Sequence, residues 1–130
     1  MSFRIGLNQL LRTAPALMAL QAARVFPTVL PEDTQLPATT YQIVGGNQRP
    51  TFGSSGVQRR RVQLDFRAAT DDVADALRDA TIGVLNGFFG ALPNGFVLAN
   101  CELIQVIDYF DNDARQFRCS AEFYFDFTLQ

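Results

Sequence analysis

The C-terminal end of the chain alternates between apolar and polar residues without interruption from Gln116 to Gln130. The apolar positions are Phe117, Cys119, Ala121, Phe123, Phe125, Phe127 and Leu129. A period of two indicates a β-strand with one buried face and one wet face. A strand this long requires a sheet whose apolar face is covered by other parts of the chain.

The remaining patterns predict the cover and the neighbouring strands. Helices are expected from Ser2 to about Thr13, from Pro15 towards Pro27, and from Thr70 to about Phe88, where Pro15 and the run Thr70-Asp71-Asp72 are helix-start signals. Strands are expected over 39–44, 57–68 and 96–110, before the C-terminal one. This order, without β–α alternation, predicts an α+β fold with a mostly antiparallel sheet of about four strands and helices on one face.

A chain of 130 residues is expected to form a single domain over 1–130. The segment from Gly45 to Gly56 is rich in Gly and Ser and follows a Pro-rich connector over 27–37. A flexible arm or loop is therefore predicted at about 45–60.

The two cysteines, Cys101 and Cys119, are expected to be reduced and buried. Pairing the last two strands around a short turn places Phe125 opposite Cys101, Phe123 opposite Leu103, Cys119 opposite Ile107, and Phe117 opposite Tyr109. In this register the cysteines lie several residue pairs apart, beyond the roughly 7 Å Cα separation that a disulfide allows.

The composition argues against most enzymatic chemistry. The chain has no His and no Lys, so triads based on His and phosphate-binding loops based on Lys are excluded. The acidic groups Asp71, Asp72 and Asp75, and Asp108, Asp111 and Asp113, are better explained by a helix start and a solvated hairpin turn than by catalysis or cation binding. No catalytic residue, metal site or cofactor is predicted. No signal peptide or membrane-spanning run is recognised, so synthesis in a cytoplasm is expected.

The sharpest polar feature is the run Arg59-Arg60-Arg61, with Arg49 upstream. Three interpretations stay open: contact with DNA phosphates, docking to an acidic surface of a neighbouring subunit or partner, and a solvated loop base. The residues predicted to contact other subunits or partners are Tyr41, Arg49, Phe52, Arg59, Arg60, Arg61 and Tyr124.

Three stretches resemble a known family. The first, in the N-terminal half, comprises Leu10-Leu11, Ala16-Leu17, Arg24-Val25-Phe26-Pro27, Leu36-Pro37 and Tyr41-Gln42-Ile43-Val44. The second, in the centre, comprises Arg61-Val62-Gln63-Leu64-Asp65-Phe66, Thr70-Asp71-Asp72-Val73-Ala74-Asp75-Ala76-Leu77 and Val84-Leu85. The third, in the closing hairpin, runs from Phe117 to Phe125. Their hydrophobic spacing, and the Pro before a strand, resemble the tail terminators, the small tail-completion proteins of tailed bacteriophages.

The resemblance implies a virion structural protein without catalytic residues. It implies a homohexameric ring that caps the head-proximal end of the tail tube, ends its polymerisation and offers a docking surface to the head connector or neck proteins. The implied partners are copies of itself, the tail tube protein, the connector, and DNA that passes without specific binding. Alternatives are a neck or head-completion protein, a tail tube protein and, more distantly, a small nucleic-acid-binding module.

Overall fold

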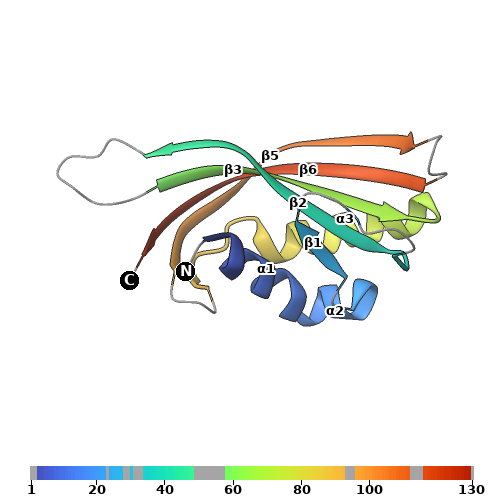
Figure 1. Ribbon diagram of the computed structural model, residues 1–130, viewed down its shortest axis with the longest axis horizontal. Helices are drawn as coiled ribbons and strands as arrows, with labels where there is room; N and C mark the ends of the chain where they lie inside the picture. The colour runs from blue at the N-terminus through green and yellow to red at the C-terminus, as the bar shows by residue number, and fades with distance from the viewer. Residues whose placement is uncertain are drawn as a thin grey trace.

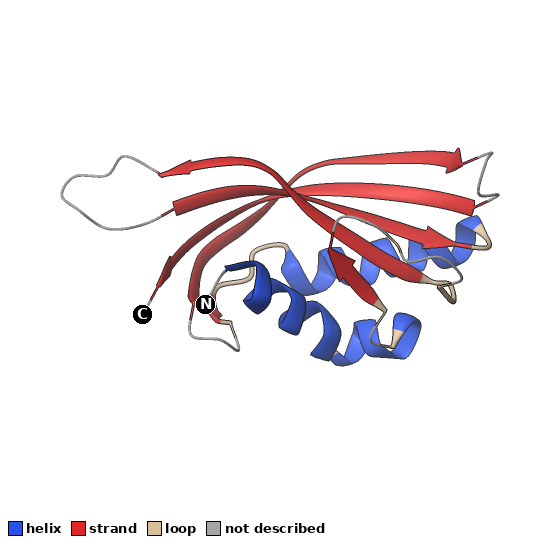
Figure 2. Cartoon of the chain, viewed as in Figure 1, coloured by secondary structure: helices blue, strands red, loops and turns tan. Residues whose placement is uncertain are grey.

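The computed structural model describes residues 3–22, 24–27, 30, 34–48, 58–92, 96–111 and 116–129. Helices and strands follow in the order α1 (Phe3–Thr13), α2 (Pro15–Gln21), β1 (Val25–Pro27), β2 (Ala38–Gln48), β3 (Gln58–Ala68), α3 (Asp71–Leu85), β4 (Gly90–Ala91), β5 (Phe96–Asp111) and β6 (Gln116–Leu129). Figure 1 and Figure 2 show two layers, a twisted sheet with the three helices on one side of it. The predicted α+β class and the position of the helices are confirmed.

The helices begin where the sequence signals place them. The backbone N–H of Val73 donates to the Thr70 side chain at 3.4 Å, and two carboxylates occupy the first turn of α3. Pro15 opens α2, where its missing N–H costs nothing because first-turn N–H groups have no partner within the helix.

The sheet differs from the prediction in strand number and direction. It has six strands in the order β1-β2-β3-β6-β5-β4, rather than about four. The central pairings are antiparallel, as expected, but β1 pairs parallel with β2 and makes the sheet mixed. The two additional strands, β1 and β4, are three and two residues long, which is too short for an alternating pattern to reveal them.

Strand also occupies part of the segment predicted as a flexible arm over 45–60. Residues 45–48 continue β2, and residues 58–60 begin β3, with Gly46 paired to Arg60. Residues 49–57, including Arg49 and Phe52, lie outside the described residues.

One row of residues crosses all four long strands: Ile43, Val62, Phe123 and Leu103. A β-bulge adjoins this row at each side of the sheet. In β2 the extra residue is Val44, and in β5 it is Ile104. Each bulge lies between this row and the turn of its own hairpin. The β2–β3 and β5–β6 hairpins extend in opposite directions from the row, so the two bulges lie on opposite sides of it (Figure 1).

The bulge at Ile104, one of two register shifts in β5, makes half of the predicted hairpin register wrong. Cys101 pairs with Phe125 and Leu103 with Phe123, as predicted, but Cys119 pairs with Asp108 rather than Ile107, and Phe117 with Phe110 rather than Tyr109. One inserted residue moves every later side chain of β5 to the opposite face. Ile107 is therefore 48% exposed.

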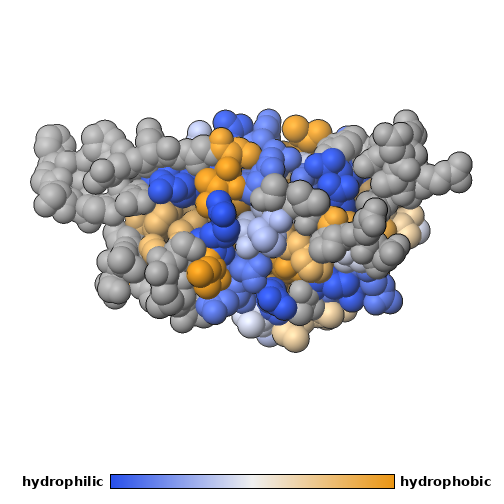
Figure 3. All heavy atoms as spheres, viewed as in Figure 1, coloured by the Kyte–Doolittle hydropathy of each residue, from blue (hydrophilic) through white to orange (hydrophobic). Residues whose placement is uncertain are grey.

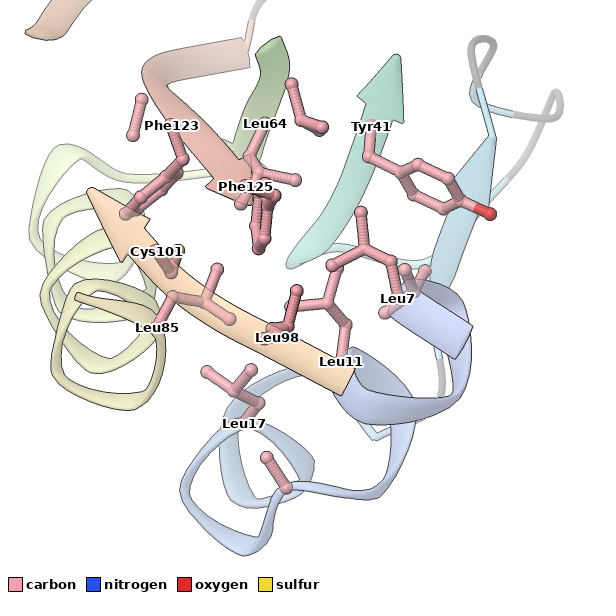
Figure 4. Packing of buried hydrophobic residues seen from close by; sticks show 14 of the residues in the cluster. Leu7, Leu11, Leu17, Tyr41, Leu64, Leu85, Leu98, Cys101, Phe123 and Phe125 are labelled. Carbon is pink, nitrogen blue, oxygen red and sulfur yellow. The ribbon is translucent and has the colours of Figure 1, made fainter. Parts of the chain in front are cut away.

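The core lies between the helices and the apolar face of the sheet (Figure 4). Leu7, Leu11 and Leu17 of the first two helices and Leu77 and Leu85 of α3 are fully buried against Leu64, Phe66, Phe123 and Phe125. The ring of Phe3 stacks on Phe127 with centroids 4.3 Å apart and is tilted against Phe125 at 5.4 Å.

Candidate functional site

The side of β3 and β6 that faces away from the helices carries a network of paired charges, which we call the bare face. Its residues are Arg59, Arg61, Gln63, Asp65, Arg67, Arg118, Ser120, Glu122, Tyr124 and Asp126. They alternate with the core residues of the same strands, which places them together on the opposite side. Polar side chains thus cover the sheet where no helix does.

Asp65 is the centre of this network. Its carboxylate accepts hydrogen bonds from Arg118 Nη2 at 2.8 Å, from Gln63 Nε2 at 3.0 Å, and from the Ser120 hydroxyl. Burial on its own raises the pKa of Asp65, but the hydrogen bonds from Ser120, Arg118 and Gln63 outweigh burial and leave the pKa below its ordinary value. The side chain is held ionised and in one orientation.

The Arg run predicted as a contact site begins in the same network. Arg59 donates from Nε and Nη2 to both carboxylate oxygens of Asp126, at 2.8 and 3.1 Å, and its guanidinium lies 4.5 Å from the Tyr124 ring centroid. The hydrogen bonds that Arg59 donates to Asp126 raise the pKa of Arg59 above its ordinary value. Arg61 donates to Glu122 at 2.7 Å. These two guanidinium charges are each matched by a carboxylate of β6.

The other predicted contact residues are distributed over both sides of the sheet. Arg60 lies on the helix side, with its guanidinium 5.7 Å from the Phe127 ring centroid. Tyr41 is 3% exposed, and its hydroxyl accepts a hydrogen bond from Asn8 Nδ2 at 3.1 Å. Tyr124 lies on the bare face beneath Arg59. The structure brings Arg59, Arg61 and Tyr124 together and places Tyr41 and Arg60 elsewhere.

A second charged cluster, not predicted from the sequence, joins α3 to the β5–β6 hairpin. Asp75, Asp108 and Cys119 have ligand atoms within 4.8 Å of one another, beside a pocket of about 290 Å³. Arg78 Nη1 lies 3.3 Å from Asp75 and 3.2 Å from Asp108, and it donates to Cys119 Sγ at 3.5 Å. Because the guanidinium already supplies the cation, the cluster is explained as a bond between elements rather than as a metal site.

Both cysteines are free and buried, as predicted. Burial raises the pKa of the Cys101 thiol to about 12. Burial, together with the Asp108 carboxylate, raises the pKa of Cys119 to about 12 despite the opposing effect of Arg78. Neither environment favours a nucleophilic thiolate.

We expect neither thiol to react with an aromatic disulfide reagent at pH 8 in the folded protein, because the thiolate is the attacking species and both thiols are protonated and covered. The release of chromophore over an hour measures this. The same protein in guanidinium chloride, where both thiols are exposed, is the control. Rapid reaction of one equivalent without denaturant would contradict the assignment.

Both outer edges of the sheet, β2 at one end and β5 at the other, are partly without a strand neighbour among the described residues. β1 covers β2 only from Thr39 to Tyr41, and β4 covers β5 only at Val97 and Leu98. Farther along β5, Gly87 N–H donates to the Cys101 carbonyl at 2.8 Å, and Leu103 N–H donates to the side chain of Asn86 at 3.2 Å. The stretches Gln42–Gln48 and Ile104–Asp111 have no strand neighbour on their outer side in the described part of the chain.

These open edges carry exposed aliphatic side chains. Val44 is 44% exposed, Ile104 37%, Val106 39% and Ile107 48%. On the face shown in Figure 3, apolar and polar side chains are interspersed. Over the described residues, no helix is long and apolar enough to cross a membrane.

Comparison with known proteins gives the family. The model of the family described as "Tail completion protein gp17" matches residues 6–125. The chain belongs to this tail completion family. The resemblance predicted from the sequence is confirmed at this level, and the match supports a structural component of a phage or phage-like virion.

A solved structure shares the fold. A chain described as "Virion of native gene transfer agent (GTA) particle" superposes with a TM-score of 0.73 at 17% identity, over 97% of this tail completion protein and 94% of that chain. No curated protein sequence matches. At this identity the likeness supports the architecture, and residue-level roles rest on the geometry described above.

Proposed function

We propose that this protein is a tail terminator, which assembles as a homohexameric ring on the head-proximal end of a tail tube, ends tube growth and presents a docking surface to the connector or neck proteins. The observation that carries the proposal is the family match over residues 6–125. The open strand edges at both sides of one sheet support a subunit that works by contact with copies of itself.

The bare face suits a protein that lets DNA pass without holding it. Nucleic-acid binding requires basic side chains available to phosphates. On this face Arg59, Arg61 and Arg118 each bond to a carboxylate of the same chain. This pairing favours the structural role over the nucleic-acid-binding module that was the distant alternative.

The experiment that tests the proposal combines two measurements. Native mass spectrometry of the purified protein, and of tails carrying it, is expected to give a closed ring of identical subunits. Electron microscopy of particles with tagged protein is expected to place one ring between tube and head. Long tubes of this protein alone would instead indicate a tube subunit, and a ring on the head side of the connector would indicate a neck or head-completion protein.

A further inference from the structure

We propose that neighbouring copies in the ring join edge to edge, the β5 stretch Ile104–Asp111 of one copy pairing with the β2 stretch Gln42–Gln48 of the next. This inference rests on the proposed ring and names the contact that closes it. It is carried by the two open edges, their exposed side chains, their charges and their positions along the sheet.

The β5 edge has only part of the usual protection of a solvent-exposed edge strand. Natural sheets protect such edges with charged side chains, Pro, bulges, very short strands or a covering segment, and this edge has the bulge at Ile104 and the acidic residues Asp108 and Asp111. Between Ile104 and Ile107 there is no charge and no Pro, and the three aliphatic side chains are at least 37% exposed. The Cys101 carbonyl accepts from Gly87 and the Leu103 N–H donates to Asn86, and beyond Leu103 no described strand pairs with this edge. Another strand would satisfy the remaining main-chain groups and cover the aliphatic side chains.

Charge favours β2, rather than a second β5, as the partner. The strand β5 carries Glu102, Asp108 and Asp111 and no basic residue, so two β5 edges side by side would bring carboxylates together. The strand β2 from Ala38 to Gln48 carries no charged residue at all. An acidic edge therefore meets no repulsion there. Pairing between different edges is also what a cyclic ring requires, since each contact then leaves one edge of each type for the next copy.

The strand directions are compatible with this pairing. The four long strands alternate in direction across the sheet, so β2 and β5 of one chain run in opposite directions. Copies related by rotation about a ring axis keep the same orientation along that axis. Their β5 and β2 edges would therefore meet antiparallel, as the strands within each copy do.

The covered parts of the two edges fit the same arrangement. The strand β1 blocks β2 on one side of the row Ile43–Val62–Phe123–Leu103, and β4 blocks β5 on the other side. The open stretches consequently lie on opposite sides of this row, which would stagger each copy along the strands relative to the next. Closed sheets require a stagger of this kind.

Cysteine cross-linking tests the contact directly. Val44→Cys is combined in turn with Ile104→Cys, Val106→Cys and Ile107→Cys, and assembled rings or tails are oxidised and run on a non-reducing gel. Both native thiols are buried with raised pKa values, so we expect them not to form cross-links in this assay. We expect a ladder of linked chains that extends beyond the dimer in at least one combination, and no linkage in the matched control Val44→Cys with Met18→Cys, where Met18 is 49% exposed on α2.

Single variants separate the two modes of pairing. If Ile107→Cys or Val44→Cys alone gives efficient dimers, like edges meet and the inference is overturned. Rings that form normally but give no ladder in any combination overturn the edge contact and leave the terminator assignment intact. A wild-type protein that forms no ring and is absent from tails removes the proposed function itself.

A charge substitution provides a second measurement. Ile107→Lys is expected to reduce ring formation at least tenfold at a given protein concentration, because a Lys guards a sheet edge against pairing. Met18→Lys replaces an equally exposed aliphatic side chain, 49% against 48%, and is expected to leave the ring unchanged. Circular dichroism of both variants verifies that the monomer is folded. Rings of Ile107→Lys that match the wild type in abundance would refute the contact.

Discussion

Replacing Phe125 with alanine is expected to lower the free energy of unfolding by about 3–5 kcal/mol, a large fraction of the roughly 5–15 kcal/mol that stabilises a typical domain. The Phe125 ring is fully buried, and it packs against Phe3 and Phe123 with centroid distances of 5.4 and 6.0 Å. Its removal leaves a cavity where α1 meets β6, at a position that helices and sheet share.

The matched control is Phe89→Ala, which removes the same atoms from a side chain that is 78% exposed. Its cost is expected to stay within about 0.5 kcal/mol. Urea unfolding of both variants, followed by far-ultraviolet circular dichroism, gives the comparison. Equal midpoints for the two variants would show that the sheet–helix core described here does not hold the fold together.

The second large effect is expected at Asp65. Asp65→Asn removes the carboxylate that Arg118, Gln63 and Ser120 surround, and is expected to cost about 2–4 kcal/mol at pH 7. The exposed acid Asp79, bonded to Arg78 at 3.0 Å, is the control. Asp79→Asn is expected to cost less than about 1 kcal/mol because its pair lies at the surface.

The effect of Asp65→Asn should depend on pH with a definite sign. The pKa of Asp65 in the folded protein lies below its ordinary value of 3.8, so the unfolded chain takes up the proton first as the pH falls. The stabilisation by Asp65 is complete above pH 3.8 and is lost as the pH drops through the folded value. The difference between wild type and Asp65→Asn in urea titrations should therefore shrink between pH 5 and the acid limit; a difference that grows on acidification would reverse the assignment.

The patterns that predicted the fold correctly are those carried by local repetition. The alternation in β6 and the helix-start signals at Pro15 and Thr70 each occupy neighbouring positions, so the local sequence determines them. The family match over residues 6–125 was likewise anticipated from hydrophobic spacing.

The features that escaped prediction depend on partners distant in the chain. The local sequence does not identify the bulges at Val44 and Ile104, yet the bulge at Ile104 moves Ile107 to the bare face. The cluster of Asp75, Arg78, Asp108 and Cys119 joins a helix to two strands, so the residue spacing within any one segment does not predict it. The alternation of β3 and β6 did indicate polar faces for both strands, and their joint register could have suggested the pairs Arg59–Asp126 and Asp65–Ser120.

If copies join into a ring as proposed, the placement of the three described helices on one side of the sheet bears on which way the ring curves (Figure 1). In a circle built from wedge-shaped subunits, the bulkier layer takes the larger circumference. If the sheets join as proposed, the helices stand at the outer radius and the paired arginines and carboxylates line the bore. DNA leaving the capsid would then pass along a polar surface with little net charge. A reconstruction of the ring that shows helices around the bore would exclude this geometry.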